Sequence, residues 1–171
     1  PYEILKYLFT KTGLFTSTIA EAGAFVKTNE DLEIPNIQFH YAPAMIVDHG
    51  RTLLWGTGMS CHSCLLRPKS HGEVTLASAD PFADPLIDPK FLSHPDDMKD
   101  MIDGYKIMMK VLGSEPFSKY ISDHSQRPID INDDADIEQA MREGADTVYH
   151  PVGTCKMGND EMSVVDSRLK A

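Results

Sequence analysis

The clearest pattern in the chain is a run of apolar residues spaced three or four positions apart between residues 95 and 112. Such spacing places apolar side chains on one face of an α-helix. Pro95 suits the first helical turn, Asp96 and Asp97 suit its positive end, and Gly113 can end the helix. The run therefore predicts a helix over 95–112 whose apolar face consists of Met98, Met101, Ile102, Tyr105, Met108, Met109 and Leu112.

Two other segments have the spacing of a helix. The opening residues "PYEILKYLF" predict a helix over 1–9, and "DDADIEQAMRE" predicts one that is capped by Asn132 and ends at Gly144. The chain starts at Pro1 and stops just after "SVVDSRLKA" with no sign of a terminal element, so we expect it to be a piece of a longer polypeptide.

Alternation of apolar and polar residues predicts strands in the first half of the chain. Ile37, Phe39 and Tyr41 alternate with Gln38 and His40, which predicts a half-buried strand with His40 on the face opposite the main apolar stripe. Segments 20–28 and 59–68 predict two more strands. Segment 71–78 predicts another, paired as a hairpin with the strand before it.

The middle of the chain contains a different kind of extended segment. Asp80, Asp84 and Asp88 each precede a proline, which disfavours the helical conformation, so residues 80–89 predict an extended connector. A last strand is predicted over 145–150. Because strands and helices do not alternate regularly, the pattern favours an α+β fold, a mostly antiparallel sheet backed by helices.

Length and charge limit the classes of function. A chain of 171 residues suits one domain, and its formal net charge of −10 disfavours nucleic acid and anionic membrane surfaces as partners. No apolar run approaches the roughly 18 residues that a membrane span requires. The three cysteines are an odd number in a chain large enough to fold without disulfides, which favours a reducing, cytoplasmic compartment.

The segment "CHSC" contains two cysteines at the spacing of a zinc or redox motif. Zinc needs four ligands and there is no second cysteine pair, while a redox cysteine is favoured at a helix start. In a strand, Cys61 and Cys64 would point to opposite faces. We therefore expect packing cysteines rather than a metal or thiol-redox site, and we predict no metal site elsewhere.

Histidines are the other candidates for chemistry. Five of them show no metal-ligand spacing, and we expect them at solvated or turn positions: His49, His62, His71, His94 and His124. His40 differs because it lies mid-strand between aromatic residues, where a buried imidazole must find a hydrogen bond or face a cavity.

The segment "TVYHPVGTCKMGND" frames His150 between a strand and a turn. Pro151 keeps His150 out of the helical region, and Gly153 permits a turn that a side chain would block. An imidazole can take a proton from an alcohol near neutral pH. A strand-ending histidine that satisfies a backbone carbonyl explains the residues equally well, so both interpretations remain open at this point.

The motif "YHPVGTCKMG" resembles the His-Pro-x-Gly-Thr-x-x-Met-Gly segment of the glucose-methanol-choline (GMC) oxidoreductases, a flavin-dependent family that oxidises alcohols. The segments "PNIQFHYAP", "LLRPKSHGEVTLASADPFADPLIDPKFL" and "DEMSVVD" resemble, in the same order, the second half of bacterial alcohol and choline dehydrogenases of that family. The resemblance covers nearly the whole chain. It implies a substrate-binding-domain fragment over residues 1–171.

The resemblance also implies roles for particular residues. His150 would lie at the flavin ring and act as the base or alkoxide partner during hydride transfer, with Pro151 beside it at the cofactor. Tyr149 would help to wall the substrate pocket, and His40 matches the histidine of the substrate-side strand. The implied reaction is oxidation of a primary alcohol to an aldehyde by FAD, with a quinone-type electron acceptor.

Alternatives to that assignment remain open. One is a choline dehydrogenase that makes betaine aldehyde, although Trp55 and Tyr149 alone cannot form the aromatic cage that a trimethylammonium group prefers. Another is a non-catalytic binding module. The family's dinucleotide-binding fingerprint and its extreme carboxy-terminal segment are missing from the sequence. We therefore expect the chain alone to be inactive and to retain no FAD, and its exposed apolar surface to favour self-association. The full-length enzyme would be cytoplasmic or peripheral to the inner membrane.

Overall fold

The computed structural model describes residues 2–52, 56, 58–121 and 129–171. Trp55 and His124 lie outside the described residues. In chain order the elements are α1 (Tyr2–Thr10), η1 (Leu14–Thr16), β1 (Ala22–Val26), β2 (Ile37–Ala42), η2 (Asp48–Gly50), β3 (Ser60–Leu65), β4 (Glu73–Thr75), β5 (Leu86–Asp88), α2 (Pro95–Leu112), α3 (Glu115–Ser118) and α4 (Asp134–Gly144). Antiparallel sheets combined with helices confirm the α+β fold class.

The central sheet has the strand order β1-β2-β3, and both pairs are antiparallel. Ile37 lies opposite Leu65, and His40 lies opposite His62. Ile37 and Phe39 are buried, whereas His40 is on the other face of the same strand. The alternation predicted for this strand is therefore confirmed.

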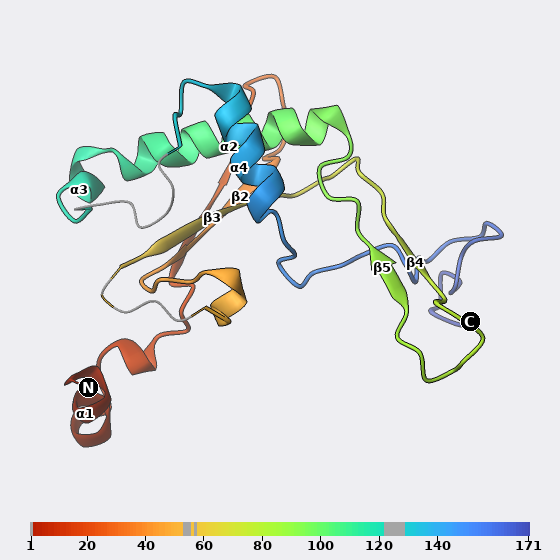
Figure 1. The fold of residues 1–171 in the computed structure, drawn as a ribbon, viewed down its shortest axis with the longest axis horizontal. Coiled ribbons are helices and arrows are strands. Elements are labelled where there is room, and N and C mark those ends of the chain that lie inside the picture. Colours follow the sequence, from red (N-terminus) through yellow and green to blue (C-terminus); the bar gives the residue numbers. More distant parts are fainter. Residues whose placement is uncertain (1, 53–55, 57, 122–128) are drawn as a thin grey trace.

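Helix α2 covers the apolar face of this sheet, and α4 packs against α2 (Figure 1). The buried residues Ile37, Phe39 and Met108 form the core between α2 and the sheet. Gly104 lets the helix approach closely, because a Cβ atom there would stand 3.0 Å from Cγ1 of Ile37. A second core joins α2 to α4 through Met98, Ile102 and Ile137.

The predicted helices are present, with one correction to their caps. The prediction for 95–112 is confirmed, and Nδ1 of His94 caps this helix by accepting a hydrogen bond from Asp96 N at 3.2 Å. The cap of α4 is Asp133, whose Oδ1 accepts from Ala135 N at 2.9 Å. The prediction of Asn132 as this cap was wrong by one residue, because only the carboxylate of Asp133 reaches the helix N–H.

Strand β4 does not form a hairpin with β3, so that prediction was wrong. It pairs instead with β5, which lies in the Asp-Pro connector, and the two make a separate antiparallel sheet. The cause lies between β3 and β4, where Lys69 and Ser70 are hydrogen-bonded to α2. These bonds turn the chain away from β3 before β4 begins. Residues 71–93, which include β4 and β5, are called the arm below; Figure 1 shows β4 and β5 extending away from the central sheet, with the C-terminus beside them.

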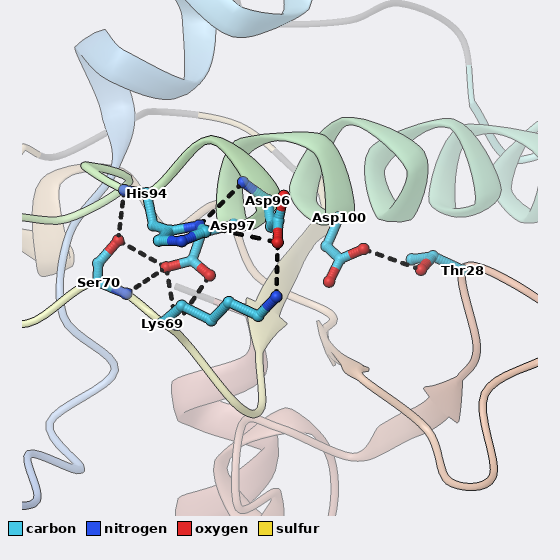
Figure 2. A network of polar contacts seen from close by, with 7 residues as sticks. All are labelled: Thr28, Lys69, Ser70, His94, Asp96, Asp97 and Asp100. Atoms are coloured by element: carbon cyan, nitrogen blue, oxygen red, sulfur yellow. Dashed lines mark hydrogen bonds and ion pairs between the residues drawn. The ribbon is translucent and has the colours of Figure 1, made fainter.

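The bonds at the base of the arm converge on Asp97 (Figure 2). Its carboxylate is 2% exposed and accepts hydrogen bonds from Lys69 N at 2.9 Å, from Ser70 N at 2.8 Å and from the Ser70 hydroxyl at 2.6 Å. The same hydroxyl oxygen accepts a bond from His94 N at 3.0 Å. One buried carboxylate thus joins the start of the arm, its end and the first turn of α2.

Helix α1 forms as predicted but buries none of its residues. Its apolar side chains face solvent, with Phe9 85% exposed. None of the helices in the described part of the chain is both long and apolar enough to span a membrane.

Candidate active site

The segment that follows α4 carries the His-Pro motif, and it is not a strand. None of residues 145–150 is in a strand, so the strand predicted there was wrong. Tyr149 has a φ of 65°, which ends the extended conformation. Side chains take up the backbone N–H groups instead: Asp146 Oδ1 accepts from Thr147 N at 2.7 Å, and Thr147 Oγ1 accepts from Tyr149 N at 2.9 Å.

His150 is exposed directly after this bend. Within the described part of the chain, no group hydrogen-bonds its imidazole, so the interpretation that it satisfies a backbone carbonyl has no support there. Gly153 has a φ of 104°, which agrees with the predicted turn after Pro151. The motif therefore presents an open imidazole between two backbone bends.

His40 lies on the face of the sheet that α2 leaves uncovered. Its Nε2 atom is buried, and no hydrogen-bond partner for it lies among the described residues. A mid-strand imidazole was expected either to find a hydrogen bond or to face a cavity. The Nε2 atom of His40 makes no hydrogen bond to the described residues. A buried nitrogen of this kind is a candidate contact for a bound polar group.

The cross-strand neighbour of His40 is another imidazole, that of His62. The pKa of His62 is lowered, first by partial desolvation of the ring and then by the neighbouring His40, with a smaller effect from His49. A backbone hydrogen bond to Ile46 acts in the opposite direction. These effects favour the neutral form of His62 on the face that also carries His40.

His49 contacts two residues of the bend that precedes His150. Its Nε2 atom is hydrogen-bonded to Oδ2 of Asp146, and its ring meets the Tyr149 ring edge-on with centroids 4.9 Å apart. The pKa of Asp146 is lowered, first by the Thr147 N–H and then by His49. His49 lies in the short turn η2, which agrees with the prediction of a solvated or turn position, and only 18% of its side chain is exposed.

The structure thus links some of the predicted site residues and leaves others apart. Tyr149, His150 and Pro151 are consecutive. His49 contacts Tyr149 and acts electrostatically on His62, the cross-strand neighbour of His40. Sequence reasoning missed Asp146 and the role of His49. The two residues are separated by 97 positions, and no spacing rule connects them.

An open hollow lies next to the motif. It is lined by Glu73 and Val74 of β4, by the turn residues 153–156 and by Met162. A Cβ atom added to Gly153 would meet nothing within 4 Å, so the turn leaves open space at this point. The hollow therefore lies between the arm and the turn that follows Pro151.

The cysteines do not form a site. Cys61 lies opposite Tyr41 and packs against the core under α2, whereas Cys64 lies opposite Gln38 on the other face. Burial raises the pKa of both thiols. The predicted divergence of the two sulfur atoms is confirmed. Across the described ranges, no three His, Cys, Asp or Glu side chains are placed to hold a metal ion.

A model of a known protein family matches the part of the chain that carries the His-Pro motif. Residues 68–171 match the family model described as GMC oxidoreductase. This range contains the arm, α2, α4 and the whole His-Pro motif.

Curated relatives match a larger part of the chain than the family model does. An alcohol dehydrogenase [acceptor] from Pseudomonas putida is 42% identical over 167 residues, which are 98% of this chain and 30% of the relative. An oxygen-dependent choline dehydrogenase from Klebsiella pneumoniae is 36% identical over 161 residues, which are 94% of this chain and 29% of the relative. The chain therefore spans about 30% of the length of these relatives.

Solved structures share the fold. The chain superposes on a pyridoxine 4-oxidase from Mesorhizobium loti with a TM-score of 0.76 and 22% identity, over 89% of this chain and 30% of that one. It superposes on a formate oxidase from Aspergillus oryzae with a TM-score of 0.78 and 22% identity, over 91% of this chain and 32% of that one.

Proposed function

The chain belongs to the GMC oxidoreductase family, and from this we propose that it is the substrate-domain part of an FAD-dependent alcohol dehydrogenase. The domain proposed spans residues 1–171, with the dinucleotide-binding part of the enzyme supplied by other residues. The proposed reaction converts a primary alcohol into an aldehyde. The observation that carries the proposal is the open imidazole of His150 between Pro151 and the Gly153 turn.

In the proposed chemistry, His150 is the group that deals with the hydroxyl proton of the alcohol. Its imidazole accepts this proton, or stabilises the alkoxide, as the carbon atom loses a hydride. FAD, when bound, supplies the acceptor for that hydride, and a quinone-type compound takes the electrons afterwards. Tyr149, whose ring is 67% exposed, forms a wall for the substrate, and the buried Nε2 atom of His40 is available to a polar group of the substrate.

The described residues fit the reactive end of FAD and not its phosphate end. His150 and Pro151 precede the turn residues 153–156 that line the open hollow, and the exposed imidazole of His150 has a nitrogen to offer an aromatic ring system. No Gly-x-Gly-x-x-Gly segment follows a strand in this sequence, so the ADP half of the cofactor requires residues outside it. We therefore propose that tight cofactor binding needs the dinucleotide-binding part of the enzyme.

We propose an aliphatic alcohol rather than choline as the substrate, and the higher identity with an alcohol dehydrogenase supports this order. Identity is 42% with the alcohol dehydrogenase and 36% with the choline dehydrogenase. Choline remains the second candidate because of the latter relative. Turnover of choline but not of 1-butanol by the full polypeptide would reverse this order.

The test of the proposed function is replacement of His150 by Gln in the full polypeptide that carries this chain. A catalytic base contributes about 100- to 10,000-fold, so we expect a loss of that size in kcat with 1-butanol. His71→Gln is the matched control, because His71 is an exposed histidine in the arm, before β4. The flavin absorbance of both variants shows whether FAD is still bound. Activity within about twofold of the parent enzyme in a flavin-loaded His150→Gln variant would overturn the proposal.

A further inference from the structure

His49 contacts the His-Pro motif at two points. Its Nε2 atom is hydrogen-bonded to Asp146, and its ring packs edge-on against Tyr149. These two residues lie on either side of Thr147, which itself bonds to both: its N–H donates to Asp146 and its hydroxyl oxygen accepts from Tyr149 N. One side chain from η2 therefore holds both ends of the four-residue bend that precedes His150.

The backbone at this contact is held in an unfavourable conformation on both sides. Asp48 and His49 have φ values of 47° and 53°, and Tyr149 has a φ of 65°. Residues other than glycine occupy this region at a cost, and they persist there only where the surroundings hold them. The His49 contact supplies such a constraint, since it joins the two bends directly.

His49 also acts on a residue of the central sheet. His49 is close enough to His62 to influence its titration, and His62 lies opposite His40 in the register of β2 and β3. His49 therefore contacts the bend that carries Tyr149 and acts electrostatically on the cross-strand neighbour of His40. Arg51 also pairs with Asp146 at 3.9 Å, and His49 adds the ring contact with Tyr149.

We propose that His49 is a positioning residue for alcohol oxidation, which, held by Asp146, fixes the Tyr149 bend and so sets where His150 stands. The proposal rests on the proposed function, in which His150 accepts the substrate proton. His49 itself touches neither substrate nor cofactor in this scheme. Its effect reaches the reaction through the position of His150, and small displacements of a catalytic group lower the rate strongly.

A first measurement tests the positioning without reference to activity. Hydrogen exchange of the amides at 146–150 is followed by mass spectrometry in the full polypeptide and its variants. We expect His49→Ala to accelerate exchange in this segment, because the Thr147 and Tyr149 N–H bonds lose their support. His49→Gln should restore protection, since its side-chain amide can donate to Asp146. His71→Ala, at an exposed histidine outside the contact, is the control and should change nothing.

A second measurement tests the consequence for the reaction. In the FAD-loaded enzyme we expect kcat with 1-butanol to fall about 10- to 100-fold in His49→Ala, with a smaller rise in KM, and to recover most of the loss in His49→Gln. Asp146→Asn, which leaves His49 in place, should give an intermediate loss and keeps the test open if His49→Ala does not fold. The His71→Ala control should retain the parent kcat.

The outcomes separate this proposal from the proposed function. Unchanged exchange at 146–150 in His49→Ala would overturn the positioning role, whatever the activity. Faster exchange with unchanged kcat would also overturn it, because the bend would then be irrelevant to the rate. If His150→Gln retains full activity, the proposed function fails by itself, and the exchange data still decide whether His49 holds the bend.

Discussion

Replacing Asp97 with Asn is expected to lower the free energy of unfolding by about 2–4 kcal/mol. The Asp97 carboxylate accepts bonds from Lys69 N, from Ser70 N and from the Ser70 hydroxyl, and it is 2% exposed. An Asn side chain keeps one oxygen and places an NH₂ group where the other stood. It therefore leaves at least one buried donor unsatisfied, which costs about 1–3 kcal/mol, and it weakens the remaining bonds by removing the charge.

Urea unfolding followed by far-ultraviolet circular dichroism measures this loss. Asp103→Asn is the matched control on the same helix, because among the described residues Asp103 pairs with Lys99, whose ammonium group is exposed, at 2.7 Å. Exposed pairs of this kind contribute about 0–1 kcal/mol. Equal stability of the Asp97→Asn variant and the parent chain near neutral pH would refute the reasoning.

The pH dependence provides a second check on Asp97. Burial alone would raise its pKa, but the hydrogen bonds from Lys69 and Ser70 outweigh burial and lower it. The folded pKa then lies below the unfolded value of about 3.9, so the ionised carboxylate stabilises the fold above that pH. This stability is lost as the pH falls through the folded pKa. The difference between the parent chain and Asp97→Asn should therefore be full near neutral pH and shrink below about pH 4.

Three further outcomes are expected. Gly104→Val should lower stability by about 1–3 kcal/mol in the same urea assay, because a Cβ atom there would stand 3.0 Å from Cγ1 of Ile37; an unchanged midpoint would contradict this close packing. A maleimide should modify exposed Cys155 first, with Cys61 and Cys64 slow until denaturant is added, because burial raises the pKa of both thiols; three equal rates would argue against it. The isolated chain should purify without flavin absorbance and reduce no dye with an alcohol, and a yellow, active preparation would contradict the proposed division of the enzyme.

Elements with a long local pattern could be predicted from the sequence. Helix α2 has apolar spacing over its whole length and a terminal signal at each end, so its bounds agree with the prediction. The strand that contains His40 was predicted with the correct face because alternation fixes the direction of every side chain once one is known. The same rule correctly predicted that the side chains of Cys61 and Cys64 point to opposite faces of the sheet.

Features that depend on distant contacts could not be predicted in this way. Strand β4 has the alternation of a hairpin partner, but its pairing depends on Asp97, which ties the preceding turn to another element. Residues 145–150 look extended, yet a bend at Tyr149 replaces the strand. The contact of His49 with Asp146 joins residues that no local pattern connects. In the candidate site, the motif around His150 was therefore recognisable, while the residues that support it were not.

The hydrogen bond at the base of the arm also determines how freely the length of the arm can change. Ser70 and His94 stand 24 positions apart and are hydrogen-bonded to each other, so the arm leaves and returns at a single closed point. The entropy of closing a loop changes only slowly with its length. Residues added near 79–83, which are exposed at the far end of the arm, would lengthen it without shifting the register of the sheet beneath α2. The arm can therefore diverge in size and sequence among enzymes that keep the same helix and sheet.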